Sequence, residues 1–180
     1  RRRPDVIGFS CYIWNIATIR ALAADLRKVL PGIPIWLGGP EVSFDAEKVL
    51  RENPSVTGVM KGEGEETFAQ LARHYVDDLT DMSDIAGLTY RNPDGTLTDT
   101  GIRPVMDRIP FSYHTVALKD LEHRIIYYES SRGCPFSCSY CLSSIDRQVR
   151  FRDLGLVREE LRYFLDAGVP QVKFVDRTFN

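Results

Sequence analysis

The stretch VIGFSCYIWNIATIRALAADLRKVLPGIPIWLGG, residues 6–39, reads as a strand, a helix and a second strand in succession. The apolar run at 6–10 is typical of a buried strand in a parallel sheet. Apolar residues then recur at the spacing of one helical face: Ile16, Ile19, Ala23, Leu26 and Leu30. Pro31-Gly32 ends this pattern, and residues 35–37 predict the next strand.

The same alternation continues to about residue 78. A shorter helix is predicted around 46–50, a strand at 56–60, and a helix whose apolar side carries Phe68, Leu71, Ala72 and Tyr75. Strands that alternate with helices predict a parallel sheet with right-handed crossovers. We therefore expect residues 1–78 to form part of a doubly wound, Rossmann-like α/β sheet, which binds ligands at the carboxyl ends of its strands.

Three loops should meet at that edge of the sheet, at residues 10–15, 38–43 and 62–65. Two of them contain glycines, in the motifs Gly38-Gly39 and Gly62-Glu63-Gly64. Glycine lets the backbone approach a ligand closely or adopt a positive φ. Taken alone, each motif is a weak signal that marks a tight turn more often than a binding site.

Residues 79–124 have the composition of a linker. Within it, the turn Asn92-Pro93-Asp94-Gly95 lies between two strand-like runs, at 87–91 and 96–99, and predicts a β-hairpin. The later segment MDRIPFSY, residues 106–113, reads as a connector. A second domain is then expected over 125–180.

This second domain opens with a strand at 125–128, which leads into SSRGCPFSCSYCLS at 130–143. The loop carries Cys134, Cys138 and Cys141 in the spacing CxxxCxxC. Four-iron clusters are normally held by four thiolates, so a loop with three leaves one iron open to a small molecule. The loop follows the carboxyl end of a strand, where barrel enzymes place their chemistry.

A helix and a second strand follow the cysteine loop. The helix has an apolar face at Val157, Leu161, Phe164 and Leu165, and the strand is predicted at 172–175. Asp176 and Arg177 would emerge at the same rim as the cysteines. A plain surface ion pair is an equally good explanation for these two residues.

The cysteines could serve other purposes than holding a cluster. Zinc could take the three thiolates with His114 or His123, but structural zinc sites favour CxxC pairs. A disulfide framework needs an oxidising compartment. Four cysteines in 180 residues, with neither a signal peptide nor an apolar run of spanning length, favour a cytoplasmic protein without a membrane span. The remaining cysteine, Cys11, is expected to be an ordinary buried residue.

Composition sets further bounds. The chain is 43% hydrophobic and 27% charged, which is enough to bury one good core or two small ones. Its net charge of −2 provides no basic field, so nucleic acid is unsupported as a partner. The chain begins without Met and ends just after a strand-like run, and we expect it to be part of a longer protein.

The cysteine loop, with Tyr140 just before its last cysteine, resembles the cluster loop of the radical S-adenosylmethionine (SAM) superfamily. In order and spacing, GFSCYIWN, LGGPEVS and VMKGEGEETF resemble the later half of the cobalamin-binding domain of one large subgroup. The resemblance implies that 125–180 begins a (β/α)6 barrel, with its first βαβ unit present. The first strand of the cobalamin domain, with its Asp-x-His-x-x-Gly motif, is missing, so the lower ligand of cobalt cannot be identified.

The resemblance also implies roles for single residues. The three cysteines would hold a 4Fe-4S cluster, while Tyr140, Asp176 and Arg177 would contact SAM. The residues that would border the cobalamin tail are Ser10, Gly38, Gly39, Gly62, Glu63 and Gly64. For Tyr140, packing as an ordinary aromatic residue is an equally good explanation.

The implied activity is cleavage of SAM to a 5′-deoxyadenosyl radical, for methyl transfer or for rearrangement or ring closure. An external donor of the flavodoxin or ferredoxin type would supply the electron. The small-molecule substrate and the catalytic residues are unknown, and we expect the present chain to be inactive by itself. A cobalamin-free iron–sulfur electron carrier and a zinc-stabilised interaction module remain the alternatives.

Overall fold

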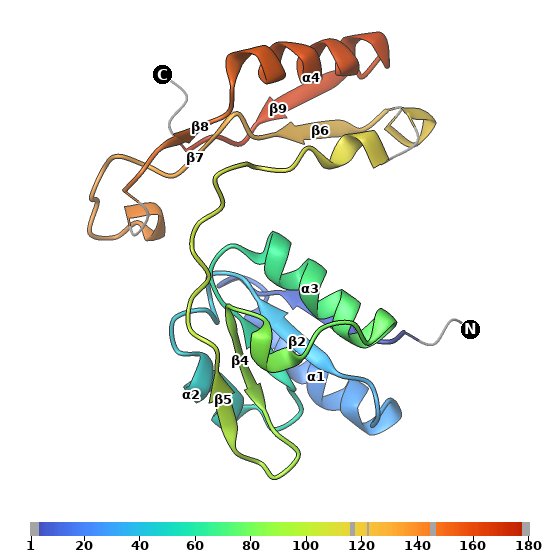
Figure 1. The fold of residues 1–180 in the computed structure, drawn as a ribbon, viewed down its shortest axis with the longest axis vertical. Helices are drawn as coiled ribbons and strands as arrows, with labels where there is room; N and C mark the ends of the chain where they lie inside the picture. Colours follow the sequence, from blue (N-terminus) through green and yellow to red (C-terminus); the bar gives the residue numbers. More distant parts are fainter. Residues whose placement is uncertain (1–3, 116–117, 122, 145–146, 178–180) are drawn as a thin grey trace. The chain divides into compact units, whose positions relative to one another are not determined.

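The computed structural model describes residues 4–115, 118–121, 123–144 and 147–177. The chain divides into two compact units, Arg1–Val105 and Met106–Asn180 (Figure 1). Each unit has its own sheet and its own hydrophobic core. Among the helices of the described ranges, none is long and apolar enough to cross a membrane.

The first unit is built on one five-stranded sheet in the order β1-β2-β3-β4-β5. Its strands are β1 (Ile7–Ser10), β2 (Ile35–Gly38), β3 (Gly58–Met60), β4 (Leu88–Arg91) and β5 (Leu97–Asp99). The first three are parallel to one another, and they alternate with α1 (Ile16–Val29), α2 (Ala46–Glu52) and α3 (Gly64–Asp77). The α/β alternation predicted over residues 1–78 is therefore confirmed.

Helices cover both faces of this sheet, because successive side chains of a strand point in opposite directions. On β2, Ile35 and Leu37 belong to the core formed with α1 and α2. Trp36 points to the other face and packs with Leu71 of α3. Its indole Nε1 donates a hydrogen bond of 3.0 Å to the hydroxyl of Tyr75. The expected doubly wound arrangement is thus present.

The hairpin of β4 and β5 continues this sheet, which differs from the linker expected over 79–124. β4 pairs antiparallel with β3, with Val59 opposite Thr89. The pairing covers the edge that β3 would otherwise expose. It also buries Lys61, whose ammonium lies 2.6 and 2.7 Å from the carboxylate oxygens of Asp99 at the end of β5. The hairpin therefore belongs to the first unit.

The second unit contains a βαβ unit formed by β6 (Ile125–Tyr128), α4 (Leu154–Asp166) and β9 (Gln171–Phe174), with the two strands parallel. This confirms the strand, helix and strand predicted there. Ile126, Tyr128 and Phe164 form the core, and Phe111 from the predicted connector packs against it. Leu165 was expected on the buried face but is 77% exposed. The barrel remains a prediction, since the described residues provide only this βαβ unit.

Two shorter strands, β7 (Ser131–Arg132) and β8 (Arg150–Phe151), form an antiparallel ribbon between β6 and α4. The cysteine loop lies between them. The described residues also form short 3-10 helices: η1 (Met82–Asp84), η2 (Ser112–Thr115), η3 (Leu118–Leu121) and η4 (Leu142–Ser144).

Candidate cofactor sites

A cavity of about 560 Å³ lies at the carboxyl ends of the first three strands. All three loops predicted to meet there contribute to it. Its lining residues are Gly8, Phe9, Ser10, Tyr12, Gly38, Gly39, Met60, Gly62, Gly64, Glu65 and Phe68. Five of the six residues that the sequence assigned to cobalamin are in this set. The sixth, Glu63, is the residue that precedes α3 and does not line the cavity.

Backbone contacts hold the first two loops together. The amide of Cys11 donates to the Gly38 carbonyl (2.7 Å), and the amide of Glu41 donates to the Cys11 carbonyl (3.3 Å). Gly39 has a φ of +98°, and a Cβ built on it would lie only 2.7 Å from the Cys11 carbonyl oxygen. Close packing of the two loops therefore requires this glycine, whether or not a ligand is bound. Cys11 itself is fully buried, as predicted.

The third loop leaves open space beside the cavity. Gly62 has a φ of +72°, and a Cβ on it would meet only Ile102, at 3.9 Å. A Cβ on Gly64, the first residue of α3, would meet no heavy atom within 4 Å. Glu65 and Glu66 lie in the first turn of α3, as predicted, where the helix dipole favours negative charge.

The sequence did not predict that the side chains of Phe9, Tyr12, Met60 and Phe68 line this cavity. Phe68 was assigned to the buried face of its helix but is 46% exposed, because it forms part of the wall. The ring of Tyr12 stacks on that of Trp14 with centroids 4.6 Å apart and planes 5° apart. The sequence did carry a signal for this part of the wall, because two aromatic residues, Tyr12 and Trp14, follow shortly after the end of β1.

The cysteine loop is the second candidate site. Cys138 is exposed, and Cys134 and Cys141 are half-buried. The amide of Cys141 donates to the Cys138 carbonyl (3.1 Å). No disulfide involves any of these thiols. Across the described ranges, no three His, Cys, Asp or Glu side chains are grouped closely enough to hold a metal ion.

Tyr140 and His114 concern two alternatives from the sequence, namely packing of Tyr140 as an ordinary aromatic residue and binding of zinc by His114. Tyr140 is 92% exposed, so it is not a packing residue in this structure. The ring of His114, a candidate zinc ligand, packs edge-on against Phe111 and Tyr163, with centroids 4.6 and 4.8 Å apart.

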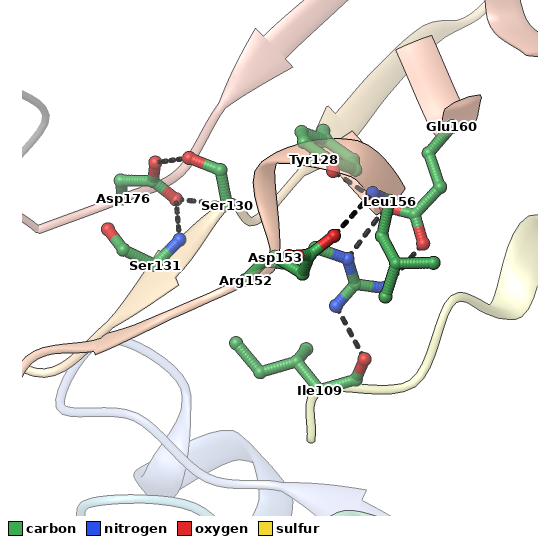
Figure 2. A network of polar contacts seen from close by, with 9 residues as sticks. All are labelled: Ile109, Tyr128, Ser130, Ser131, Arg152, Asp153, Leu156, Glu160 and Asp176. Carbon is green, nitrogen blue, oxygen red and sulfur yellow. Dashed lines mark hydrogen bonds and ion pairs between the residues drawn. The ribbon is translucent and has the colours of Figure 1, made fainter. Parts of the chain in front are cut away.

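Asp176 binds the chain just before the cysteine loop. Its Oδ1 accepts hydrogen bonds from the amides of Ser130 (2.7 Å) and Ser131 (3.0 Å), and its Oδ2 accepts one from the Ser130 hydroxyl (Figure 2). Arg177 is exposed. The roles of Asp176 and Arg177 stay predictions.

Sequence reasoning also missed a buried ion pair between Arg152 and Glu160, whose side chains are 7% and 8% exposed. Tyr128 donates a hydrogen bond of 2.6 Å to the same carboxylate. Burial, then the hydrogen bond to Glu160 and its charge, raise the pKa of Tyr128 well above its usual range. A signal was available, because Glu160 falls within the apolar spacing of Val157, Leu161 and Phe164.

Known proteins match both units of the chain. Residues 1–72 match the B12 binding domain family. An uncharacterized methyltransferase of Pyrococcus horikoshii is 30% identical over 189 residues, covering 98% of this chain and 40% of that protein. The cobalamin-dependent radical SAM methyltransferase TokK of Streptomyces tokunonensis is 26% identical over 193 residues, covering 98% of this chain and 28% of TokK.

A solved structure shares the fold. It is the radical SAM methyltransferase TsrM from Kitasatospora setae, with a TM-score of 0.68 and 19% identity, covering 99% of this chain and 38% of TsrM. The chain thus spans at most 40% of the length of each relative named here. These matches confirm the resemblance drawn from the sequence: the chain is similar over nearly its whole length to cobalamin-dependent radical SAM proteins, and residues 1–72 match the B12 binding domain family.

Proposed function

We propose that this chain contributes to the cobalamin site and to the start of the radical SAM domain of an enzyme. The observation that carries the proposal is that three loops, far apart in sequence, surround one cavity at the carboxyl ends of parallel strands. Ligands of open α/β sheets bind at this edge. The match of residues 1–72 to the B12 binding domain family supports cobalamin as the ligand.

The residues around the cavity fit a large, partly apolar ligand. The volume of the cavity, about 560 Å³, lies within the usual range of ligand pockets, roughly 300 to 1,000 Å³. Ser10, Gly38 and Gly39 would form one wall, and Gly62 and Gly64 another. Met60 and Phe68 would supply apolar contact. Glu63, which directly precedes α3, would border the cobalamin tail.

The donors of the cysteine loop fit an iron–sulfur cluster by their chemistry, since thiolates are the usual ligands of such clusters. Cys134, Cys138 and Cys141 would hold a 4Fe-4S cluster and leave one iron to bind SAM. When bound and reduced, the cluster supplies the electron that cleaves SAM to methionine and a 5′-deoxyadenosyl radical.

Three residues near the loop would bind SAM. Tyr140 and Arg177 are exposed and accessible to a cofactor. Asp176 already accepts three hydrogen bonds, and a carboxylate offers about four lone-pair sites. One position on Asp176 therefore remains for a donor such as the amino group of SAM.

The activity that we propose is radical chemistry on a small molecule, with methyl transfer as the first candidate because the named relatives are methyltransferases. Rearrangement or ring closure is the second candidate. An external flavodoxin or ferredoxin type of protein would donate electrons. Thiols that must stay reduced also suit the cytoplasm.

Anaerobic reconstitution with iron and sulfide tests the cluster. We expect the wild-type chain to take up a 4Fe-4S cluster whose electron paramagnetic resonance spectrum changes when SAM is added. Cys138→Ala should abolish the cluster. The matched control Cys11→Ala removes a thiol outside the loop and should leave the cluster intact.

The outcomes separate the alternatives. A cluster whose spectrum ignores SAM would favour an electron carrier, and zinc uptake without a cluster would favour an interaction module. Loss of the cluster in Cys11→Ala would refute the ligand assignment. For the first unit, titration of the whole protein with cobalamin, followed by visible absorbance, should give saturable binding, and its absence would refute the cobalamin site.

A further inference from the structure

The part of the cysteine loop that carries the three thiols, residues 133–144, lies between the paired strands β7 and β8, which we call the two stems of the loop. Ser131 and Arg132 on β7 lie opposite Phe151 and Arg150 on β8. The pairing extends one step further, since the Arg152 amide donates to the carbonyl of Ser130 (2.9 Å). The position of the three thiols therefore depends on what holds these stems.

Separate carboxylates hold the two stems (Figure 2). Asp176, from the end of β9, binds the first stem through the Ser130 and Ser131 amides. Glu160, from α4, binds the second stem through Arg152. The guanidinium pairs in bidentate fashion, with Nε 2.6 Å from Oε2 and Nη2 2.9 Å from Oε1.

The remaining guanidinium nitrogen of Arg152 is also engaged. Its Nη1 donates to the carbonyl of Ile109 (2.5 Å), in the segment that precedes η2. Arg150, two residues earlier on β8, donates in the same way to the carbonyl of Met106 (2.8 Å). The second stem is thereby fixed to α4 on one side and to residues 106–109 on the other.

Glu160 also joins the two sides of the loop at its base. Tyr128, the last residue of β6 before the loop, donates to Glu160 Oε2 (2.6 Å), the same oxygen that accepts from Arg152 Nε. One carboxylate thus binds a residue before the loop and a residue after it. All three side chains are almost fully buried.

Stability alone gives little reason for such a group, because two well-packed apolar side chains are often as stable as a buried ion pair. An apolar pair, however, cannot fix the orientation of the two segments that it joins. A planar guanidinium that binds one carboxylate through two nitrogens admits a single orientation, and lysine cannot reproduce it.

We propose that Tyr128, Arg152 and Glu160 are positioning residues that set the place of the cysteine loop, so that a cluster bound there presents its open iron correctly to SAM. This inference rests on the proposed function, since it takes the loop to be the cluster loop. None of the three touches the reacting atoms. They act by fixing the position of the stems that flank the loop.

The first test needs no cofactor. Arg152→Met with Glu160→Met removes both charges together, so that no unpaired charge stays buried. Hydrogen exchange of the Arg152-position amide should become at least tenfold faster, while the Leu37 amide in the first unit keeps its rate. Tyr128→Phe, which keeps the ring, should show a smaller change of the same sign. Unchanged exchange in both variants would overturn the proposal.

The second test uses the reconstituted chain. At equal iron content, the double variant should need at least tenfold more SAM for the same spectral change, and Arg152→Lys should not restore the wild-type value. The matched control, Arg158→Met with Glu159→Met, removes two exposed charges from α4, the helix that carries Glu160, and should behave as wild type. Equal SAM response in the double variant and wild type would overturn the proposal. A wild-type cluster that ignores SAM would refute the proposed function instead, and the exchange measurement would still decide the role of the three residues.

Discussion

Replacing Gly39 by alanine should destabilise the first unit by about 3 to 4 kcal/mol. Its φ of +98° costs an L-residue on the order of 1 to 2 kcal/mol. The added Cβ would also lie 2.7 Å from the Cys11 carbonyl oxygen and 3.0 Å from the Cys11 nitrogen. Relieving that contact must lengthen two backbone hydrogen bonds, to Gly38 and from Glu41, each worth about 1 kcal/mol.

Two glycines of the same cavity serve as matched controls. Gly62→Ala has the positive φ without the close contact, so it should cost only about 1 to 2 kcal/mol. Gly64→Ala has neither, and it starts a helix that favours alanine, so stability should not fall. Urea unfolding followed by tryptophan fluorescence measures this order, because both tryptophans, Trp14 and Trp36, lie in the first unit.

The three variants separate loop packing from ligand binding. If Gly39→Ala costs no more than Gly62→Ala, close packing against Cys11 is not the reason for a glycine at position 39. Gly64→Ala should weaken cobalamin binding by the whole protein without a loss of stability, because its methyl group enters the cavity. Unchanged cobalamin affinity of Gly64→Ala would refute a ligand in that part of the cavity.

Further predictions concern the sheet and its buried charge. Gly58→Ala would place a Cβ 2.3 Å from the Trp36 ring and should cost about 1 to 3 kcal/mol in urea unfolding, an effect that Trp36→Phe should reduce, whereas Gly32→Ala meets no neighbour and should be neutral. Asp99→Asn should cost about 2 kcal/mol in the same assay, because it weakens the partner of the buried Lys61 ammonium. Burial opposes ionisation of Asp99, but hydrogen bonds, first that from Lys61, lower its pKa. Its stabilising contribution is therefore present above about pH 3.9, the unfolded value, and is lost as the pH falls through the lower folded pKa. As the pH falls through the lowered folded pKa of Asp99, wild type should lose more stability than Asp99→Asn, and equal losses would contradict this assignment.

Local patterns predicted the helices and strands because burial leaves a periodic trace. The apolar stripe of α1 is an example: Ile19 and Ala23 are buried, and the helix begins at Ile16, the first residue of the stripe. The cavity was predictable for a related reason, since the carboxyl ends of parallel strands must share an edge. Five of the six residues expected to border the cobalamin tail do line it.

Pairing between distant segments leaves no periodic pattern in the sequence. The sequence around Asn92 predicts a hairpin, but nothing local tells that β4 pairs with β3 or that Lys61 meets Asp99, 38 residues later in the chain. Likewise, Glu160 looks like any helical carboxylate until Arg152 is placed beside it. These contacts join distant residues through side chains of ordinary type, so only the three-dimensional structure reveals them.

The closed base of the cysteine loop has a consequence for protein engineering. Because Tyr128 and Arg152 meet on one carboxylate, β6 and α4 are joined below the loop rather than through it. The loop can therefore be exchanged for that of a relative, with another length or another set of residues around the cysteines, while the body of the unit keeps its bonds. Under the proposed function, such exchanges would transplant cluster environments from relatives into this chain.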